Sequence, residues 1–394
     1  MIKKDFYDVI VIGAGPAGST TAKFTLKNNK KADVLVLDKH AEIGSPKRCG
    51  EGLGARAFRE LNIPKDPRFI NKEIYGFVVY SPNRTLVKVR YDNSSGYIIE
   101  RKIFDKFLAS ESARAGAEVC SNVFASLWKE NGKILGVKAK EFGEERKIKA
   151  KIIVAADGVD SRIARDAGIN STLNPIHLDS CIEYEMINIR IDEPDLIHLF
   201  MGNKIAPRGY LWIFPKDDDR ANVGIGILGN ETKTAKYYLD KFIKEHEFLE
   251  KGSILEVNVG AVPVGGFLKE LVKENVLVVG DAARQVNPLH GGGIYEAMSA
   301  AKIAGEKIAK VIEENNTLIL KDYEREWWST HGEKLKKVLK IRNFAEKLSD
   351  EDMNYLAKIW SGEDLTELSR GKHVEVFKKA LKHPKLFTLI KKFI

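Results

Sequence analysis

The chain has 394 residues, of which 44% are hydrophobic and 30% charged; this excludes a disordered or low-complexity protein and provides enough chain for two joined domains. Its formal net charge of +9 and pI near 9.1 favour anionic partners, such as a phosphorylated substrate, an acidic electron carrier or an anionic membrane surface. Nucleic acid is disfavoured, because no recognition motif and no basic stretch interleaved with stacking aromatic residues occurs.

The cysteine content and the N-terminus indicate the compartment. Cys49, Cys120 and Cys181 are too few and too widely spaced for a disulfide framework or a zinc site, so we expect a reducing, cytoplasmic setting and no metal. Residues 1–13 contain two lysines and a short apolar run, but no signal-peptide cleavage pattern follows them. No run of about eighteen apolar residues occurs, so the sequence predicts no membrane-spanning helix.

The N-terminal segment predicts a buried strand followed by a phosphate-binding turn. Asp8 to Ile12 is a continuous β-branched run, which is typical of a parallel strand covered on both faces. The next residues spell G-x-G-x-x-G: Gly13 permits a tight turn, Gly15 lets the backbone approach a pyrophosphate, and Gly18 lets the following helix pack closely. The free N–H groups at that helix start would bind the anion.

A second strand, residues 34–37, ends in Asp38. At the tip of this strand the Asp38 carboxylate would accept hydrogen bonds from both ribose hydroxyls, which disfavours a 2′-phosphate there. Residues 100–105 open a helix that contains Arg101, and a strand over 118–125 ends at Ala125, beside the expected adenine. Arg101 has an alternative use in an ion pair with Glu100 or Asp105 on the protein surface.

Two later segments repeat the pattern of a buried strand that ends in a turn. Residues 151–165 carry an Asp157-Gly158 turn, and the apolar strand at the start of residues 275–283 ends at Gly280-Asp281. Each aspartate alone is explained slightly better as a turn residue that bonds its own backbone. Because the second motif lies far from the first glycine turn, one long ligand such as FAD accounts for both better than NAD does. Asp281 would then accept a hydrogen bond from the ribityl chain, and Gly291, Gly292 and Gly293 would supply backbone donors before a helix from Ile294.

A cysteine loop and an aromatic strand complete the motifs. Residues 48–53 read RCGEGL, and residues 207–215 read PRGYLWIFP, followed by Gly224-Ile225-Gly226. In a strand, period two places Tyr210, Trp212 and Phe214 on one face, where they would form an aromatic wall. An ordinary half-buried sheet is the alternative.

Over residues 1 to about 310, these nucleotide motifs resemble the flavoprotein superfamily of para-hydroxybenzoate hydroxylase. The RCGEGL loop and the Tyr-x-Trp-x-Phe-Pro strand depart from the hydroxylase pattern and are similar to the geranylgeranyl reductases, especially the archaeal digeranylgeranylglycerophospholipid reductases. The resemblance implies an α/β fold: a Rossmann-like FAD-binding domain, an inserted antiparallel-sheet substrate domain and a helical C-terminal region. The implied FAD-binding domain consists of residues 1–74, 98–169 and 271–315. The implied substrate domain consists of residues 75–97 and 170–270, and the helical C-terminal region of residues 316–394.

The resemblance also implies residue roles. FAD would contact Gly13, Gly15, Ala17, Gly18, Asp38, Arg48, Cys49, Gly50, Gly52, Arg101, Ala125, Asp281, Gly291, Gly292, Gly293 and Ile294. The substrate would contact Tyr210, Trp212, Phe214 and Pro215. The implied activity is FAD-dependent saturation of geranylgeranyl chains, on digeranylgeranylglycerophospholipids of archaeal membranes. An FAD monooxygenase of an aromatic or isoprenoid substrate, and a non-catalytic flavin-binding electron-transfer protein, are the alternatives.

Reduction of an isolated prenyl double bond requires a proton as well as a hydride, so the sequence predicts a general acid near the flavin. Cys49 is the first candidate, followed by Tyr210 and His290. The positive charge of Arg48, which precedes Cys49 in the chain, would favour the thiolate, and this argues against simple acid catalysis by Cys49. The alternative interpretation of Cys49 is a small buried hydrophobic residue. Some members of the family carry cysteine near the position of His290, so a disulfide from there to Cys49 does not exist in this chain.

No second dinucleotide motif appears, so the electron donor is expected to be external: ferredoxin, NADPH or a reduced deazaflavin. Residues 370–394 combine lysines with regularly spaced apolar residues. They predict either a helical lid on the core or an amphipathic segment that makes peripheral contact with anionic lipid on the inner membrane face.

Overall fold

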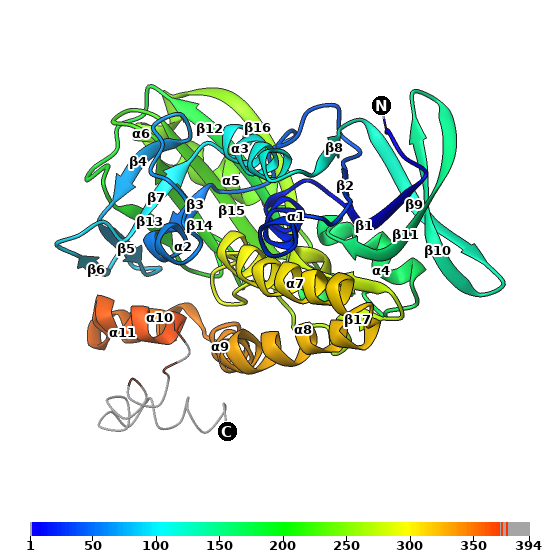
Figure 1. The fold of residues 1–394 in the computed structure, drawn as a ribbon. Coiled ribbons are helices and arrows are strands. Elements are labelled where there is room, and N and C mark those ends of the chain that lie inside the picture. Colours follow the sequence, from blue (N-terminus) through cyan, green and yellow to red (C-terminus); the bar gives the residue numbers. More distant parts are fainter. Residues whose placement is uncertain (1, 371, 373–375, 377–394) are drawn as a thin grey trace.

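The computed structural model describes residues 2–370, 372 and 376, and shows two large sheets with helices packed between and beside them (Figure 1). The eight-stranded sheet has the order β17-β18-β11-β1-β2-β8, and β10 and β9 extend it as a hairpin from β11. Its strands are β1 (Phe6–Ile12), β2 (Val34–Leu37), β8 (Glu118–Cys120), β9 (Val123–Glu130), β10 (Lys133–Glu141), β11 (Glu144–Ala155), β17 (Val272–Lys273) and β18 (Val276–Val278).

The parallel centre of this sheet follows from its sequence. Strands β18, β11, β1, β2 and β8 run parallel. Residues 34–37 of β2 and 276–278 of β18 are fully buried, because helices cover the sheet. Helix α1 (Pro16–Asn28) packs on α7 (Ile294–Glu314) and on α3 (Arg101–Arg114), as Figure 1 shows for α1 and α7. All the turns of the nucleotide motifs therefore lie at one edge of one sheet.

One predicted strand is divided. The expected strand over 118–125 is two strands, β8 and β9, because Asn122 adopts a left-handed conformation with φ 58°. Asparagine tolerates that conformation better than most residues. The chain therefore turns between the strands, and Ala125 lies on β9, which pairs with β10.

The second sheet has seven strands in the order β16-β12-β15-β14-β13-β5-β6. They are β5 (Gly76–Tyr80), β6 (Leu86–Arg90), β12 (Leu178–Ile187), β13 (Ile197–Phe200), β14 (Tyr210–Pro215), β15 (Ala221–Leu228) and β16 (Ser253–Pro263). Helices α5 (Ala235–Lys244) and α6 (Glu247–Glu250) share a buried core with one face of this sheet. The opposite face is turned toward the cavity described below.

The sheet is antiparallel, as expected, except that β13 lies parallel to β5. No hairpin joins these two strands, because a long stretch of chain separates them, so nothing forces the antiparallel direction. A third, three-stranded sheet has the order β3-β7-β4. Its strands are β3 (Gly52–Gly54), β4 (Ile70–Ile74) and β7 (Gly96–Ile99). The domain boundaries stay a prediction.

Short helices complete the two ends of the cofactor half. Helix α2 (Ala55–Glu60) follows the cysteine loop, and α4 (Arg162–Asp166) follows the Asp157 turn. Within the described part of the chain, no helix combines the length and the apolar composition needed to cross a membrane.

The C-terminal helices form an outer wall against the seven-stranded sheet. Helix α8 (Leu320–Trp327) leads through a π-helical turn, Trp328–Gly332, into α9 (Glu333–Ala345), α10 (Asp350–Ile359) and α11 (Gly362–Ser369). The Tyr91 hydroxyl bonds Thr366 Oγ1 at 2.7 Å, and Asn203 Nδ2 donates to the Leu348 carbonyl at 3.0 Å. Figure 1 shows α10 and α11 beneath β5 and β6. The predicted lid or lipid-binding segment of 370–394 falls almost entirely outside the described residues.

Candidate active site and cofactor cavity

A cavity of about 1420 Å³ joins the turns of the eight-stranded sheet to the open face of the seven-stranded sheet. Pockets for a single small ligand usually measure about 300–1,000 Å³, so this one has room for a dinucleotide and a second ligand. The end that lies between the sheet and the C-terminal helices is apolar; six of the residues that line it are Val79, Leu199, Met201, Phe344, Leu356 and Trp360.

The glycine turn after β1 contains two glycines that are required for different reasons, Gly13 for packing against the protein and Gly15 for room for a ligand. Gly13 has φ 109°, and a Cβ there would lie 2.2 Å from the Ala156 carbonyl oxygen, so protein atoms alone require glycine. Gly15 lines the cavity, and a Cβ there would meet no protein atom within 4 Å. A bare backbone that faces open space at a helix start fits a pyrophosphate. The described residues therefore suit FAD. Ala17 and the buried Gly18 lie in the first turn of α1.

Asp38 follows β2 and lines the same cavity. Its Oδ2 accepts a hydrogen bond from the Ala14 N–H at 2.9 Å, and its Oδ1 accepts one from the His40 N–H at 2.9 Å. These bonds hold the carboxylate over the glycine turn, where a ribose would lie.

The two later aspartates have different surroundings. Asp157 Oδ2 accepts from the Ile163 N–H at 3.0 Å, so this residue orders the turn before α4, which is the alternative considered for it. Asp281 borders the cavity in the turn that follows β18, and its Oδ1 would lie 3.1 Å from a Cβ on Gly293. Burial raises the pKa of Asp281, and the Arg101 guanidinium opposes that rise. Asp281 and the glycines before α7 are thus brought together, as the ribityl hypothesis requires.

Arg101 and Ala125 both border the cavity. Arg101 forms a two-point ion pair with Asp105, with both bonds at 2.8 Å, and the pair is mostly buried. The sequence alternative for Arg101 is therefore correct in its partner but wrong in placing the pair on the surface. The Ala125 carbonyl accepts a hydrogen bond from Arg162 at 3.3 Å.

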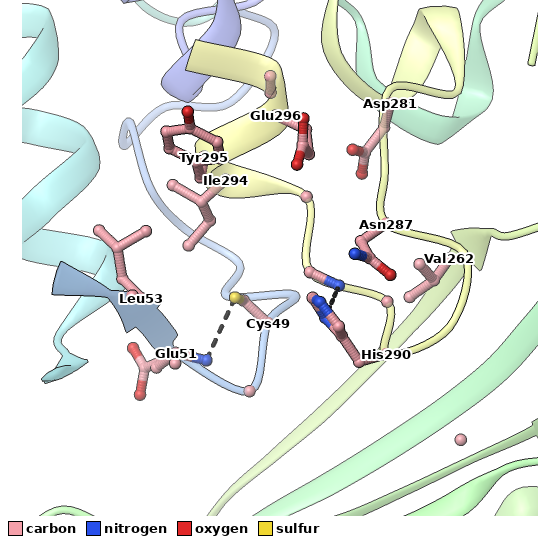
Figure 2. Close-up of a pocket in the computed structure, with 18 of the residues that line it drawn as sticks. Cys49, Glu51, Leu53, Val262, Asp281, Asn287, His290, Ile294, Tyr295 and Glu296 are labelled. Atoms are coloured by element: carbon pink, nitrogen blue, oxygen red, sulfur yellow. Dashed lines mark hydrogen bonds between the residues drawn. The ribbon is translucent and has the colours of Figure 1, made fainter. Parts of the chain in front are cut away.

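The cysteine loop lies flat on the aromatic strand because its glycines carry no side chains. A Cβ on Gly50 would lie 3.1 Å from Phe214 Cε2, and a Cβ on Gly52 would lie 3.2 Å from the same atom. Figure 2 shows Cys49 on this loop and His290 on the opposite loop facing the same space, close to Ile294 at the start of α7. The cysteine loop, the aromatic strand and the segment from His290 to Ile294 therefore surround one part of the cavity.

The structure corrects the expected protonation of Cys49. Arg48 is exposed, whereas burial raises the pKa of the Cys49 thiol. The positive group that opposes this rise is Arg101, not the neighbouring Arg48. Desolvation penalises the thiolate more than the nearby cation favours it, so Cys49 keeps its proton at neutral pH. A protonated thiol can act as an acid, which the sequence interpretation had disfavoured.

Tyr210 and His290 are linked to each other. The Tyr210 hydroxyl donates to the His290 backbone carbonyl at 2.6 Å, and burial raises the pKa of Tyr210. His290 Nδ1 accepts from the Gly292 N–H at 3.1 Å, which assigns the ring proton to Nε2. The His290 side chain borders the cavity, yet the surrounding protein desolvates it and lowers its pKa. The ring is therefore neutral at pH 7.

Strand β14 presents the aromatic wall as its alternation predicts. The ring centroids of Tyr210 and Trp212 lie 5.8 Å apart, and those of Trp212 and Phe214 lie 6.0 Å apart. All three line the cavity, while Leu211 and Ile213 belong to the core beneath α5. Pro215 was expected to contact substrate, but it is buried and does not line the cavity, because period two turns it toward that core.

The two glycines of β15 explain the spacing of the motifs. In the register of β14 and β15, Tyr210 pairs with Gly226 and Trp212 pairs with Gly224. A Cβ on Gly224 would lie 2.3 Å from Trp212 Cζ2, so the indole occupies the space that a side chain would fill. Trp212 Nε1 donates to Glu183 Oε2 at 3.0 Å.

A buried group of ions behind the cysteine loop was not predicted from the sequence. Lys216 Nζ lies 2.9 Å from Glu51, 2.8 Å from Glu100 and 2.9 Å from Glu185. Among the described residues, these three carboxylates are the one set spaced to hold a metal ion, and the ammonium group already lies among them. Lys47 pairs with Glu51 at 3.1 Å. No sequence motif marks these contacts, since they join residues far apart in the chain.

Family models match three parts of the chain. The geranylgeranyl reductase catalytic domain matches residues 177–262, an NAD(P)-binding Rossmann-like domain matches 11–60, and an FAD binding domain matches 256–332. The first covers the strands of the aromatic wall, and the other two cover the glycine turn and the Asp281 segment.

Curated relatives match nearly the whole chain. The digeranylgeranylglycerophospholipid reductase of Methanocaldococcus jannaschii is 40% identical over 376 residues, which is 94% of either chain. Digeranylgeranylglycerophospholipid reductase 2 of Methanococcoides burtonii is 41% identical over 362 residues, 90% of this chain and 88% of its own.

Solved structures share the fold. The crystal structure of a geranylgeranyl bacteriochlorophyll reductase-like protein from Thermoplasma acidophilum has a TM-score of 0.89 and 34% identity, covering 99% of this chain and 100% of its own. A flavin-dependent brominase has a TM-score of 0.75 at 18% identity, covering 98% of this chain and 99% of its own, and shows the fold alone.

Proposed function

We propose that this chain, which belongs to the geranylgeranyl reductase family, is an FAD-dependent reductase that saturates the double bonds of geranylgeranyl chains on a digeranylgeranylglycerophospholipid. The relatives that span nearly its full length are named for that lipid. Within the family, the substrate class therefore follows from similarity over the whole chain, and the site supports it independently.

The observation that carries the proposal is the continuity of the cavity. It begins at the glycine turn, passes between Cys49 and the aromatic strand, and ends in an apolar space between the seven-stranded sheet and helices α9, α10 and α11. A long prenyl chain has the shape and the polarity to occupy that apolar end. A cavity for a small aromatic molecule would need neither such length nor so many aliphatic residues.

The chain's own residues supply what a flavin cannot. When bound, FAD would supply the hydride for the alkene, and protonation of the other alkene carbon must come from an acid. Cys49 has the required features: its burial keeps the thiol protonated, and it lies at the junction of the cofactor and apolar parts of the cavity. The Tyr210 proton is engaged with the His290 carbonyl, so Tyr210 is better suited to holding that loop.

The aromatic wall would stabilise the positive charge that develops on the alkene. Tyr210, Trp212 and Phe214 line the cavity beside the Cys49 loop. The electron-rich faces of aromatic rings attract cations by about 0.5–2 kcal/mol each. Protonation by Cys49 and charge stabilisation by this wall would then act on the same bond.

The electron donor and the location of the protein are further parts of the proposal. We infer an external donor, which is ferredoxin, NADPH or a reduced deazaflavin, because the sequence holds a single dinucleotide motif. A cytoplasmic enzyme that meets its lipid at the inner membrane face would suit the net charge of +9.

Anaerobic turnover tests the function. Purified holoenzyme, reduced chemically without oxygen and mixed with digeranylgeranylglyceryl phosphate, should yield products whose masses increase in steps of two hydrogens. A requirement for oxygen, with a hydroxylated product, would instead support the monooxygenase. No lipid product, together with rapid reoxidation of the flavin by an added one-electron acceptor such as ferricyanide, would support an electron-transfer protein.

Substitution tests the role of Cys49. Cys49→Ala should lower the rate of prenyl reduction by about 100-fold or more at matched flavin content, since general acids contribute about 10²–10⁴-fold. Cys120→Ala is the matched control, because Cys120 is buried on β8 and does not line the cavity. An unchanged rate for Cys49→Ala would remove Cys49 from the reaction.

A further inference from the structure

Glu51, in the middle of the cysteine loop, has an unusual conformation for a residue with a side chain. Its φ is 72°, in the left-handed region, and its side chain is completely buried. Glycine adopts this conformation without steric cost, and Gly50 and Gly52 flank it. A glutamate at this position indicates that its carboxylate has a use that outweighs the backbone strain.

The carboxylate is held by donors from four parts of the chain. Oε2 accepts from Lys216 Nζ at 2.9 Å, from Lys47 Nζ at 3.1 Å and from Asn222 Nδ2 at 2.8 Å. Oε1 accepts from the Arg101 backbone N–H at 2.6 Å. Lys216 directly follows the aromatic strand, Asn222 lies on β15, and Arg101 begins α3. One side chain therefore joins the loop to the aromatic wall and to the cofactor half.

The backbone of the same residue holds the thiol. The Glu51 N–H donates to Cys49 Sγ at 3.2 Å, and the Glu51 carbonyl accepts from the Ile99 N–H on β7 at 2.9 Å. Figure 2 shows the bond between the Glu51 N–H and Cys49. Asn222 Nδ2 also donates to the Gly50 carbonyl at 3.3 Å. The backbone next to the thiol is thus held by hydrogen bonds that involve either Glu51 itself or Asn222, which also binds the Glu51 carboxylate.

We propose that Glu51 is a positioning residue, whose clamped carboxylate fixes the Cys49 thiol at the junction of the cofactor cradle and the aromatic wall. Its consequence for catalysis rests on the proposed function of Cys49. The geometric claim about the thiol stands apart from it and has a separate readout.

The negative charge of Glu51 predicts the direction in which the pKa of Cys49 changes when Glu51 is replaced. The Glu51 carboxylate contributes to raising the pKa of the Cys49 thiol, although burial is the larger cause. Replacing the carboxylate by an amide removes this negative charge while Lys47 and Lys216 stay in place. The pKa of Cys49 should therefore fall, and the thiol should react with alkylating reagents at lower pH. Unfolding would also expose the thiol and lower its pKa, so the profile is compared only between variants whose urea unfolding midpoints match that of wild type.

The experiment measures alkylation of Cys49 by iodoacetamide as a function of pH in flavin-loaded enzyme, with the modified peptide identified by mass spectrometry. Glu51→Gln should move the midpoint of the profile to lower pH. Glu51→Gly permits the left-handed backbone but removes the clamp, so it should also alkylate faster than wild type. Glu185→Gln is the matched control, because Glu185 contacts Lys47 and Lys216 but does not belong to the loop.

Prenyl reduction is measured in parallel at matched flavin content. Both Glu51 variants should lose about 10- to 100-fold in rate, since displacement of a reacting group by about 1 Å costs about 10²-fold. Both variants keep Glu185 and Glu100 beside the two lysines, so the ion cluster retains counter-charges. Asn222→Ala changes no charge and offers an independent route to loosening the loop, with faster alkylation expected.

The outcomes separate the two claims. If the wild-type alkylation profile persists in Glu51→Gln, Glu51→Gly and Asn222→Ala, or if Glu185→Gln shifts it as far as Glu51→Gln does, Glu51 does not position the thiol. If the alkylation profile shifts as predicted but wild-type enzyme reduces no prenyl chain, the positioning role stands and the proposed function fails.

Discussion

Gly224 lies on β15 beside Trp212 of the aromatic wall, and Gly224→Ala tests whether the wall is needed. A Cβ at this position would lie 2.3 Å from Trp212 Cζ2 and 2.4 Å from Trp212 Cε2. Ordinary contacts begin at 3.4 Å, so the indole would have to move by about 1 Å. The move would also stretch the hydrogen bond from Trp212 Nε1 to Glu183, which is 3.0 Å long.

These two effects set the expected loss of stability. Overpacking costs about 1–3 kcal/mol and a buried hydrogen bond contributes about 0.5–1.5 kcal/mol, so the free energy of unfolding should fall by about 1.5–4.5 kcal/mol. Because the displaced indole faces the cavity, prenyl reduction should fall by about tenfold or more even in the folded, flavin-loaded fraction.

Gly226→Ala is the matched control two residues along the same strand. Its Cβ would meet Cys181 Sγ at 3.2 Å and no other atom closer than 3.8 Å, so a small shift accommodates it. Urea unfolding followed by tryptophan fluorescence should place Gly226→Ala within about 1 kcal/mol of wild type. The reasoning is refuted if the two variants unfold at the same urea concentration and reduce prenyl chains equally well.

Three other predictions follow from the same contacts. Gly15→Ala should fold with wild-type stability but purify without flavin colour, whereas Gly13→Ala, whose Cβ would lie 2.2 Å from a carbonyl oxygen, should misfold; a yellow Gly15→Ala protein contradicts the cradle. Burial raises the pKa of Glu183 from 4.5 to about 8, so the stability that its protonated form contributes is complete below about pH 4.5 and is lost as the pH rises through 8. The urea midpoint of wild type should therefore fall across that interval, and Glu183→Gln should reduce this fall. An equal fall in both proteins would show that Glu183 is not protonated in the folded state. Arg342 forms a buried two-point ion pair with Asp179 at 2.6 and 3.0 Å, so Arg342→Ala should cost about 3–5 kcal/mol in urea unfolding, against about 1 kcal/mol or less for an exposed pair, and equal costs would mean that α9 is held by other contacts.

Local motifs determined the cofactor half of this protein. A buried strand, a glycine turn and an acid at the next strand end impose their geometry within a few residues, so the sequence alone predicted that Gly15 and Asp38 lie together at this turn. Period two likewise placed Tyr210 and Trp212 on one face of a strand and Leu211 in the core. These features depend on backbone periodicity and steric size, which neighbouring residues set.

Electrostatic surroundings were decided only by the tertiary structure. The sequence placed Arg48 beside Cys49, whereas the fold exposes Arg48 and brings Arg101 to the thiol. A pKa depends on every charge and on the burial within several ångströms, and a charged group such as Arg101 comes from an element far from Cys49 in the chain. The same is true of Lys216, whose three carboxylate partners lie on a loop, before a helix and on a strand. Sequence periodicity fixes which way a side chain points, but the packing of distant elements decides what it meets there.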